Sequence, residues 1–416
     1  MSDLKRRAET IIANLLEYSP AVYLNGPRQS GKSTVAENLA NTVLNADYLT
    51  FDEPSLLSAA QHDAENFLAG FPGNVVIDEA QMAPAIFRLL KKAIDQNRRQ
   101  AGKKNRKYLL TGSADVMALP ELADALVGRV LIQTLYPFSM GELLGKKENF
   151  IAQIFSNQKF SFQRNAFTKL SHDFLTQATF PEIAVQKKID RHKWFESYLA
   201  TILQRDMLNL ADISNLSAVP RMLKLLAAQV GGLLNDASLA RDAGLNLMTY
   251  RRYRLLLEAL FLVQPVRPWF RNISKRLVKA PKIYLVDTAL LCHLLGLNAT
   301  DLKTTQPELF GKVLENFIAT ELLKQLSFGE TGELYHFRTQ DGKEIDFVLQ
   351  RPDGKLVVIE VKSRSTVNED DFKTIHYLRD QIPGDFVRGI VFYTGKDIIP
   401  FGKDCYALPI QALWEM

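Results

Sequence analysis

Eight residues near the N-terminus have the spacing of a phosphate-binding loop. Gly26-Pro27-Arg28-Gln29-Ser30-Gly31-Lys32-Ser33 fits the pattern GxxxxGK[ST]. The apolar run 21–24 directly precedes it, as a strand that turns sharply into a helix requires. Glycines let the backbone wrap phosphate groups, and the N–H groups of the loop and of the helix N-terminus supply partial positive charge. The pattern predicts a P-loop that binds a nucleoside triphosphate.

Each position of this loop has a predicted role. Lys32 is placed to reach the β- and γ-phosphates of ATP, and the Ser33 hydroxyl to hold Mg²⁺. Pro27 has no N–H, so the donors of the cradle begin at Arg28. The predicted nucleotide-binding residues are Gly26, Pro27, Arg28, Gln29, Ser30, Gly31, Lys32, Ser33 and Thr34.

A second apolar run, 74–77, ends in two acids, Asp78 and Glu79. Asp78 would hold Mg²⁺ directly or through water, and Glu79 would orient and deprotonate the attacking water. An apolar run that ends in acids is weak evidence alone, because many strands do so. About fifty residues after a P-loop, it indicates a Walker B strand and therefore ATP hydrolysis as well as binding.

Three further positions are candidates for the same site. Ser113 or Thr111, at the end of the next predicted strand, would contact the γ-phosphate or the water; the alternative is a hydroxyl that caps the turn. Arg129 would stabilise transition-state charge, also as an arginine finger in a neighbouring subunit of a homo-oligomer. A surface arginine is the alternative. Asp52 either supports the site or caps a helix.

Composition and charge set outer limits on the protein. The chain has 416 residues, a net charge of +5 and two cysteines, Cys292 and Cys405, in no metal or disulfide pattern. Such a length predicts two to four domains, and so mild a charge does not itself argue for nucleic acid. No signal peptide and no apolar run of about 18 residues is evident. We therefore expect a soluble, cytoplasmic protein with no membrane partner.

The order of predicted elements suggests four domains. Strands are predicted at 22–24, 48–51, 75–77, 108–111 and 130–135, alternating with helices in the α/β manner. We expect a P-loop ATPase domain at 1–145, a helical lid at 146–215, a winged helix-turn-helix at 216–300 and an α/β domain at 301–416. The expected fold class is therefore α/β, with an AAA+/ASCE-type P-loop NTPase domain first.

The predicted third domain is rich in arginine. Helices are expected at 223–230, 236–243 and 249–261, and residues 261–282 would form a wing. A winged helix-turn-helix would put Arg251 and Arg252, with Met248 and Thr249, near a DNA groove. It would put Lys275 and Arg276 on phosphates. The alternative is a winged helix used only for packing, with its arginines in solvent. A second basic run at 88–107 would either form a surface that tracks phosphates or be a solvated helix and loop.

The C-terminal part contains acids in a nuclease-like order. Glu315 lies in a predicted helix, Asp346 in a strand, and Glu360 and Lys362 on one face of the next strand. This order resembles the PD-(D/E)xK fold of restriction endonucleases. Asp346 and Glu360 would hold Mg²⁺ or Mn²⁺, while Lys362 orients the attacking water. The alternative is a retained fold that does not cut, with Lys362 only neutralising buried acids.

Nearly the whole chain resembles one family. The P-loop, Val-Ile-Asp-Glu-Ala-Gln at 76–81, Leu-Thr-Gly-Ser at 110–113, Gly-Arg-Val at 128–130 and Tyr-Pro-Phe-Ser at 136–139 are its motifs. So are Pro-Lys-Ile-Tyr at 281–284, Asp287 and Glu-Val-Lys at 360–362. Together they resemble the bacterial and archaeal AAA+-type ATPases with a C-terminal domain of unknown function, DUF4143. One departure is Ala178-Thr179 before Phe-Pro-Glu, where that family usually has glycines.

The resemblance implies ATP binding and hydrolysis. The leading hypothesis is a Mg-ATP-driven switch or motor that acts on DNA. The alternative is an ATP-gated interaction or regulatory module whose nuclease-like domain is catalytically silent. A nucleotide-dependent defence or toxin-linked regulator is indistinguishable from the first by sequence.

Overall fold

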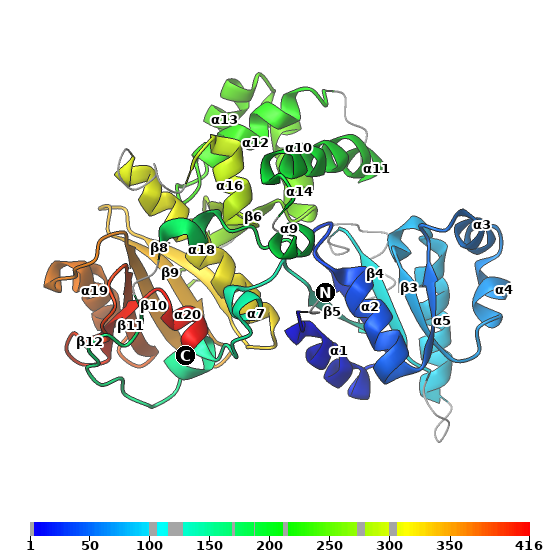
Figure 1. Ribbon diagram of the computed structural model, residues 1–416, viewed down its shortest axis with the longest axis horizontal. Helices are drawn as coiled ribbons and strands as arrows, with labels where there is room; N and C mark the ends of the chain where they lie inside the picture. Colours follow the sequence, from blue (N-terminus) through cyan, green and yellow to red (C-terminus); the bar gives the residue numbers. More distant parts are fainter. Residues whose placement is uncertain are drawn as a thin grey trace. The chain divides into compact units, whose positions relative to one another are not determined.

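A computed structural model describes residues 4–99, 106–114, 128–168, 171–186, 188–210, 215–272, 279–298 and 306–416 (Figure 1). The chain divides into two compact units. Unit 1 contains residues 1–138 with Ala259–Phe261, and unit 2 contains Ser139–Glu258 with Leu262–Met416. Each unit is built on its own β-sheet. The predicted α/β fold class, with a parallel sheet first, is confirmed.

Unit 1 alternates strands and helices. The strands are β1 Ala21–Asn25, β2 Ala46–Thr50, β3 Asn74–Asp78, β4 Tyr108–Gly112 and β5 Val130–Thr134. The helices are α1 Arg7–Tyr18, α2 Lys32–Leu39, α3 Pro54–His62, α4 Ala64–Ala69 and α5 Ala85–Arg99. All five predicted strands are present, with ends shifted by one or two residues. The strands are parallel, in the order β2-β3-β4-β1-β5.

Helices cover both faces of this sheet, so its central strands read as continuous apolar runs. On one face Val22 and Leu24 pack with residues of α1 and α2, such as Ile12 and Val35. On the other face Tyr23 packs with residues of α3, α4 and α5. Because all strands are parallel, β1, β3 and β4 end at one edge of the sheet, which is where ligands of open α/β sheets bind. The P-loop and both Walker B acids therefore share that edge.

Unit 2 is larger. Its helices are α7 Met140–Leu144, α8 Phe150–Ile154, α9 Pro181–Val185, α10 Arg191–Thr201, α11 Met207–Leu210, α12 Ala218–Ala228, α13 Asp236–Ala243, α14 Leu247–Ala259, α16 Thr288–Leu295, α18 Pro307–Ser327, α19 Lys373–Gln381 and α20 Ala412–Glu415. Its strands are β6 Val263–Pro268, β7 Lys282–Leu285, β8 Glu333–Arg338, β9 Glu344–Gln350, β10 Leu356–Lys362, β11 Phe386–Tyr393, β12 Ile399–Pro400 and β13 Cys405–Pro409.

The three predicted helices of the middle segment are present as α12, α13 and α14. Helix α12 begins five residues before its predicted start, and Pro220 lies in its first turn, where proline is tolerated. Residues 261–282, the predicted wing, contain β6 and end at the first residue of β7. Strands β6 and β7 pair antiparallel, and residues 273–278 lie outside the described part of the chain. Thr179, where the resembled family has glycine, donates its N–H and hydroxyl to Asp287 at 2.8 and 2.6 Å.

Strands β6 and β7 belong to the same sheet as the C-terminal strands. The order is β12-β13-β11-β10-β9-β8-β6-β7, and β6 joins β8 in parallel through Arg267 and Pro268. Helix α18 lies against β7, β8 and β10, while α19 packs on β9, β10 and β11 (Figure 1). Asn316 of α18 accepts the N–H of Leu285, the last residue of β7, at 2.8 Å. The middle segment and the C-terminal segment therefore share one sheet.

No helix among the described residues is long and apolar enough to cross a membrane.

A substitution at Gly112 tests the tight contact between β4 and β1. A Cβ at this position would lie 1.8 Å from the Tyr23 hydroxyl oxygen, and Tyr23 is fully buried. Gly112→Ala should therefore lower the free energy of unfolding of unit 1 by about 1–3 kcal/mol, as overpacking does. Urea unfolding followed by circular dichroism measures the change. Gly73→Ala is the control, because a Cβ there meets nothing within 4 Å; equal losses in both variants would contradict the prediction.

Candidate nucleotide site and acidic centre

The P-loop has the backbone shape that its sequence predicts. Gly26, Gln29 and Gly31 have φ angles of 145°, 59° and 93°. Glycine adopts positive φ without steric cost, and Gly26 is also close to its neighbour: a Cβ there would lie 2.2 Å from the Leu135 carbonyl oxygen. Helix α2 begins at Lys32, directly after the left-handed Gly31. The loop N–H groups and the helix N-terminus thus lie together, which suits an anion.

Two cations hold the loop. Lys32 is buried, and its Nζ donates to the carbonyl oxygens of Gly26 at 3.0 Å and Pro27 at 2.8 Å. Arg6, just before α1, donates to the carbonyls of Ser30 and Tyr136, both at 2.7 Å. Arg6 could not be predicted from local sequence patterns, because its partners are 24 and 130 residues away. Arg28 is half-buried, while Ser33 and Thr34 are exposed in the first turn of α2.

Asp78 and Glu79 are joined through Thr111. Asp78 is buried at the end of β3, and its Oδ1 accepts a hydrogen bond from the Thr111 hydroxyl on β4. That hydroxyl in turn accepts the Glu79 N–H at 3.1 Å. Glu79 adopts the left-handed conformation with φ 54°, rare for a residue with a side chain and frequent at functional sites. Thr111 therefore ties the Asp78 carboxylate to the backbone at Glu79.

Ser113 and Gln81 surround the Glu79 carboxylate. The Gln81 side-chain amide donates to Glu79 Oε2 and, at 3.3 Å, to the Ser113 hydroxyl. The Ser113 hydroxyl lies 3.5 Å from Glu79 Oε2. The structure thus brings both predicted sensor hydroxyls, Thr111 and Ser113, to the Walker B acids. Gln81 also contacts the Glu79 carboxylate, although no role was predicted for it from the sequence.

Tyr48 joins the predicted magnesium ligands. Its hydroxyl interacts with the side chains of Asp78 and Ser33. Burial, and then the charge of Asp78, raise the pKa of Tyr48 well above its ordinary value. Ser33, Tyr48 and Asp78 therefore present oxygen atoms to one place beside the P-loop. Carboxylate and other oxygen atoms are the ligands that Mg²⁺ prefers, so Asp78 with Ser33 fits the predicted ion, and Tyr48 is their hydrogen-bonding neighbour.

Arg129 does not lie near the P-loop of its own chain. It precedes β5, whose first residue, Val130, pairs with Ala21 at the start of β1. The P-loop follows the far end of β1, roughly 13 Å further along at 3.3 Å per residue. Arg129 makes a two-bond pair with Asp95 of α5, at 2.9 and 3.0 Å. Asp52 is exposed just beyond β2.

Family comparisons agree with this geometry. Residues 18–144 match the family described as an AAA domain, and residues 310–413 match the domain of unknown function DUF4143. The chain combines an AAA domain with a DUF4143 domain. Residues 168–301 match another domain of unknown function, DUF8612. The family resemblance drawn from the sequence motifs is confirmed, and unit 1 has an AAA-type P-loop ATPase fold.

Two mycobacterial proteins are similar to nearly the whole of this chain. Uncharacterized proteins of Mycobacterium tuberculosis and Mycobacterium bovis are each 29% identical over 410 residues, which are 98% of this chain and 84% of theirs. A Walker-type ATPase of Pyrococcus abyssi is 16% identical, with a TM-score of 0.41 over 70% of this chain and 96% of that one. The RuvB Holliday junction branch migration motor of Thermotoga maritima is 17% identical, with a TM-score of 0.28 over 62% and 89%. TM-scores this low carry no functional argument.

The predicted DNA-contacting residues differ in their surroundings. Arg251 of α14 pairs with Asp236 at 3.0 Å, yet its side chain stays 54% exposed. Arg252, Met248 and Thr249 lie on the same helix, and Met248 is 79% exposed. Arg254 is instead enclosed by Asp236 and Glu258 and joins α13 to α14. Lys275 and Arg276 lie outside the described residues.

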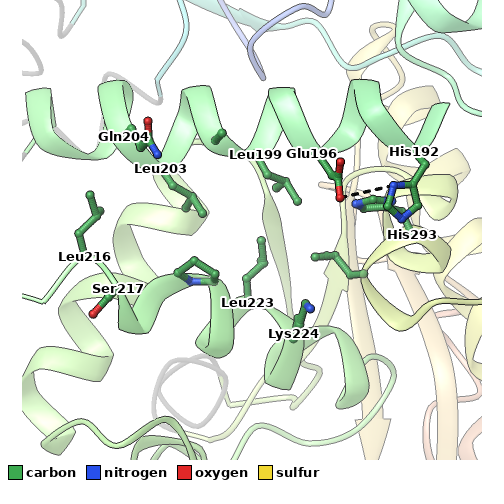
Figure 2. Close-up of a pocket in the computed structure, with 13 residues that line it drawn as sticks. His192, Glu196, Leu199, Leu203, Gln204, Leu216, Ser217, Leu223, Lys224 and His293 are labelled. Carbon is green, nitrogen blue, oxygen red and sulfur yellow. Dashed lines mark ion pairs between the residues drawn. The ribbon is translucent and has the colours of Figure 1, made fainter. Parts of the chain in front are cut away.

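Unit 2 also contains a groove of about 670 Å³ between α10 and α12 (Figure 2). Leucines such as Leu199, Leu203 and Leu223 line part of its wall, and polar and charged side chains line much of the rest. His192 and His293 meet at one end, with ring centroids 4.5 Å apart. Burial, and then the neighbouring His192, lower the pKa of His293. We assign no ligand to this groove.

Four carboxylates, which we call the acidic centre, meet in unit 2: Glu315, Glu344, Asp346 and Glu360. The first three surround Lys282 of β7, whose Nζ lies 3.0, 2.7 and 3.4 Å from them. Lys282 is only 1% exposed. Burial alone would lower the pKa of Lys282, but the three carboxylates outweigh it and raise that pKa above its ordinary value. Lys282 is therefore charged inside the protein.

The rest of the centre is also engaged. Asp346 Oδ2 accepts the Val361 N–H at 2.9 Å, and Lys362 donates to Glu360 Oε1 at 2.7 Å. Burial, and then the charge of Asp346, raise the pKa of Glu315 to about 7 and that of Glu360 to about 8. Within the described ranges no group of three or more His, Cys, Asp or Glu side chains could hold a metal ion. The predicted second Mg²⁺ or Mn²⁺ does not fit these contacts.

The buried His336 on β8 should make the folded protein less stable at acidic pH. Burial, and then the charge of Lys282, lower the pKa of this buried imidazole to about 4; Glu344 and Arg338 also face it. Between pH 6.5 and 4 the unfolded chain takes up a proton that the folded chain refuses, so stability falls as the pH falls. From about pH 7 to about pH 5 this residue should cost about 2 kcal/mol.

Urea unfolding of the wild type and of His336→Leu, each at about pH 7 and about pH 5, isolates the contribution of His336. The other titratable groups are present in both proteins, so their effects cancel in the comparison. The wild type should lose more stability on acidification than the variant. His62→Leu serves as the control, since His62 is exposed. Parallel losses in wild type and His336→Leu would contradict the assignment.

Proposed function

We propose that this protein binds Mg-ATP and hydrolyses ATP in its AAA domain. The observation that supports this most is the hydrogen-bonded connection Asp78–Thr111–Glu79 at the strand ends beside the P-loop. This arrangement supports Asp78 as a metal ligand and Glu79 as the base that activates the attacking water. A domain that bound ATP without hydrolysing it would need only the P-loop.

The roles follow from the contacts. The N–H groups from Arg28 to Thr34 would bind phosphate oxygens, and the Lys32 ammonium would leave the loop carbonyls for the β- and γ-phosphates. Ser33 and Asp78 would hold Mg²⁺, which neutralises phosphate charge when bound. Glu79 would accept the proton of the attacking water, and Ser113 with Gln81 would orient its carboxylate. We propose Arg129 for catalysis only in a neighbouring subunit of a homo-oligomer, after it leaves Asp95.

Two substitutions separate binding from turnover. Lys32→Ala should abolish nucleotide binding, because the phosphate charge loses its buried partner. Glu79→Gln should still bind ATP but hydrolyse it about 10²–10⁴-fold more slowly, the contribution of a general base. A fluorescent ATP analogue measures binding, and phosphate release measures turnover. Asp47→Asn, at an exposed acid of β2, is the control. Full hydrolysis by Glu79→Gln would refute the base assignment.

We also propose that the protein uses ATP hydrolysis to act on DNA. It would contact DNA through a winged helix formed by α12–α14 with β6 and β7. The exposed start of α14, with Met248, Arg251 and Arg252, supports this. A further polar groove of about 850 Å³ in unit 2 is lined by Arg267, Arg271 and Arg351, and arginine is suited to phosphate. Both features supply the positive charge that a DNA backbone requires.

The alternative is an ATP-gated regulatory module with a silent nuclease-like domain. Two observations favour it for particular residues. Asp236 ties Arg251 and Arg254 to α13, as a helix used for packing would require. In the acidic centre Lys282 neutralises the carboxylates that a metal would need. The two functions differ in whether the protein binds DNA with a steep salt dependence.

DNA contact by α14 predicts a change in that salt dependence. Each phosphate contact contributes about one unit to the slope of log affinity against log salt concentration. Arg251→Ala/Arg252→Ala should therefore weaken duplex binding and reduce the slope by about two. Fluorescence anisotropy across a salt series measures both. Lys403→Ala is the matched control, as an exposed cation in a C-terminal turn. An unchanged slope in the double variant would count against α14 and favour the regulatory module.

A further inference from the structure

The acidic centre of unit 2 is assembled by two separately matched segments. Glu315, Glu344, Asp346 and Glu360 lie in the DUF4143 match, whereas Lys282 and Tyr284 lie in the DUF8612 match. Both of the latter residues are on β7, and the Tyr284 hydroxyl donates to Glu315 Oε1 at 2.6 Å. The segment before the DUF4143 match therefore supplies a cation, Lys282, and a hydroxyl donor, Tyr284, to the carboxylates of the nuclease-like motif.

We infer that Lys282 takes the place of a divalent cation in the acidic centre and excludes one from it. Its ammonium group lies within 3.4 Å of oxygen atoms of Glu315, Glu344 and Asp346. Carboxylates on three sides are the surroundings that Mg²⁺ or Mn²⁺ would use. A metal ion bound to the same oxygens, at 2.0–2.6 Å for hard cations, would approach the ammonium too closely to coexist with it.

The oxygens left over do not make a metal site. Asp346 Oδ2 is taken by the Val361 N–H, and Glu360 Oε1 by Lys362. Glu360 Oε2 is buried and lacks a hydrogen-bond partner in the described part of the chain. Mg²⁺ requires about six oxygen ligands in near-octahedral geometry, and Glu315 Oε2 with Glu360 Oε2 would supply only two of them.

Lys282 is fixed by its backbone as well as by charge. Lys282 pairs with Val266 of β6 on one side and forms a bridge with Leu233 on the other. The Leu234 N–H donates to the Pro281 carbonyl at 2.9 Å. The turn after α12 also reaches the centre: a Cβ at Gly231 would lie 2.9 Å from Glu315 Oε2. The ammonium group therefore has a fixed position, and its departure would leave buried carboxylates unpaired.

Metal uptake by the nucleotide-free, full-length protein tests this inference. Equilibrium dialysis against MnCl₂ should give no uptake that depends on Asp346 in the wild type. Lys282→Met removes the charge and keeps the length of the side chain. It should bind Mn²⁺ at least about tenfold more tightly than the wild type, a difference of about 1.4 kcal/mol. Asp346→Asn in the Lys282→Met background should remove that uptake.

Lys343→Met is the matched control, because Lys343 pairs with Asp341 at the surface and should not change Mn²⁺ uptake. Two results would overturn the inference: wild-type uptake that Asp346→Asn abolishes, or a folded Lys282→Met that gains none. The wild-type comparison decides even where Lys282→Met does not fold. ATP turnover is measured separately, so failure of the ATPase proposal would leave this result unaffected.

Discussion

A buried charge must be matched within the protein, and in unit 2 this requirement joins the middle of the chain to its C-terminal part. Lys282 lies on β7, and its three carboxylate partners come from α18 and β9. Breaking such a cluster on one side would leave charge without water or partner, at a cost of several kcal/mol. The position of β7 against α18 is therefore set by ion pairing as well as by the sheet.

The N-terminal fold was predictable because its signals are local. Parallel strands covered on both faces are continuous apolar runs, and those of β1, β3 and β4 stand next to their functional residues in the sequence. The parallel arrangement then brings the ends of these strands together. Gly26, Lys32, Asp78 and Thr111 could be placed at one edge of the sheet for this reason alone.

The residues that sequence reasoning missed act across long separations. Arg6 reaches Tyr136, Tyr48 reaches Asp78, and Lys282 reaches Asp346. Only Lys282 carried a signal, as a lysine at the start of an otherwise apolar strand. The same limit applied to Arg129, which was predicted to stabilise transition-state charge. The register of β5 puts it near the start of β1, at the end of the strands opposite to the P-loop. The residue types indicated which chemistry these positions could perform. Which of them lie close together in space could be seen only from the folded structure.

The shared sheet of unit 2 has a consequence for how the protein can be divided. Strand β8 forms ladders with β9 on one side and with β6, from the preceding segment, on the other. A fragment that started at α18 would leave β8 as an open edge with unsatisfied backbone groups, the situation that promotes self-association of sheets. It would also expose Glu315 and Asp346 without their ammonium partner. The DUF4143 segment is thus one part of a larger folding unit, and its evolutionary boundaries do not mark an autonomous piece of protein.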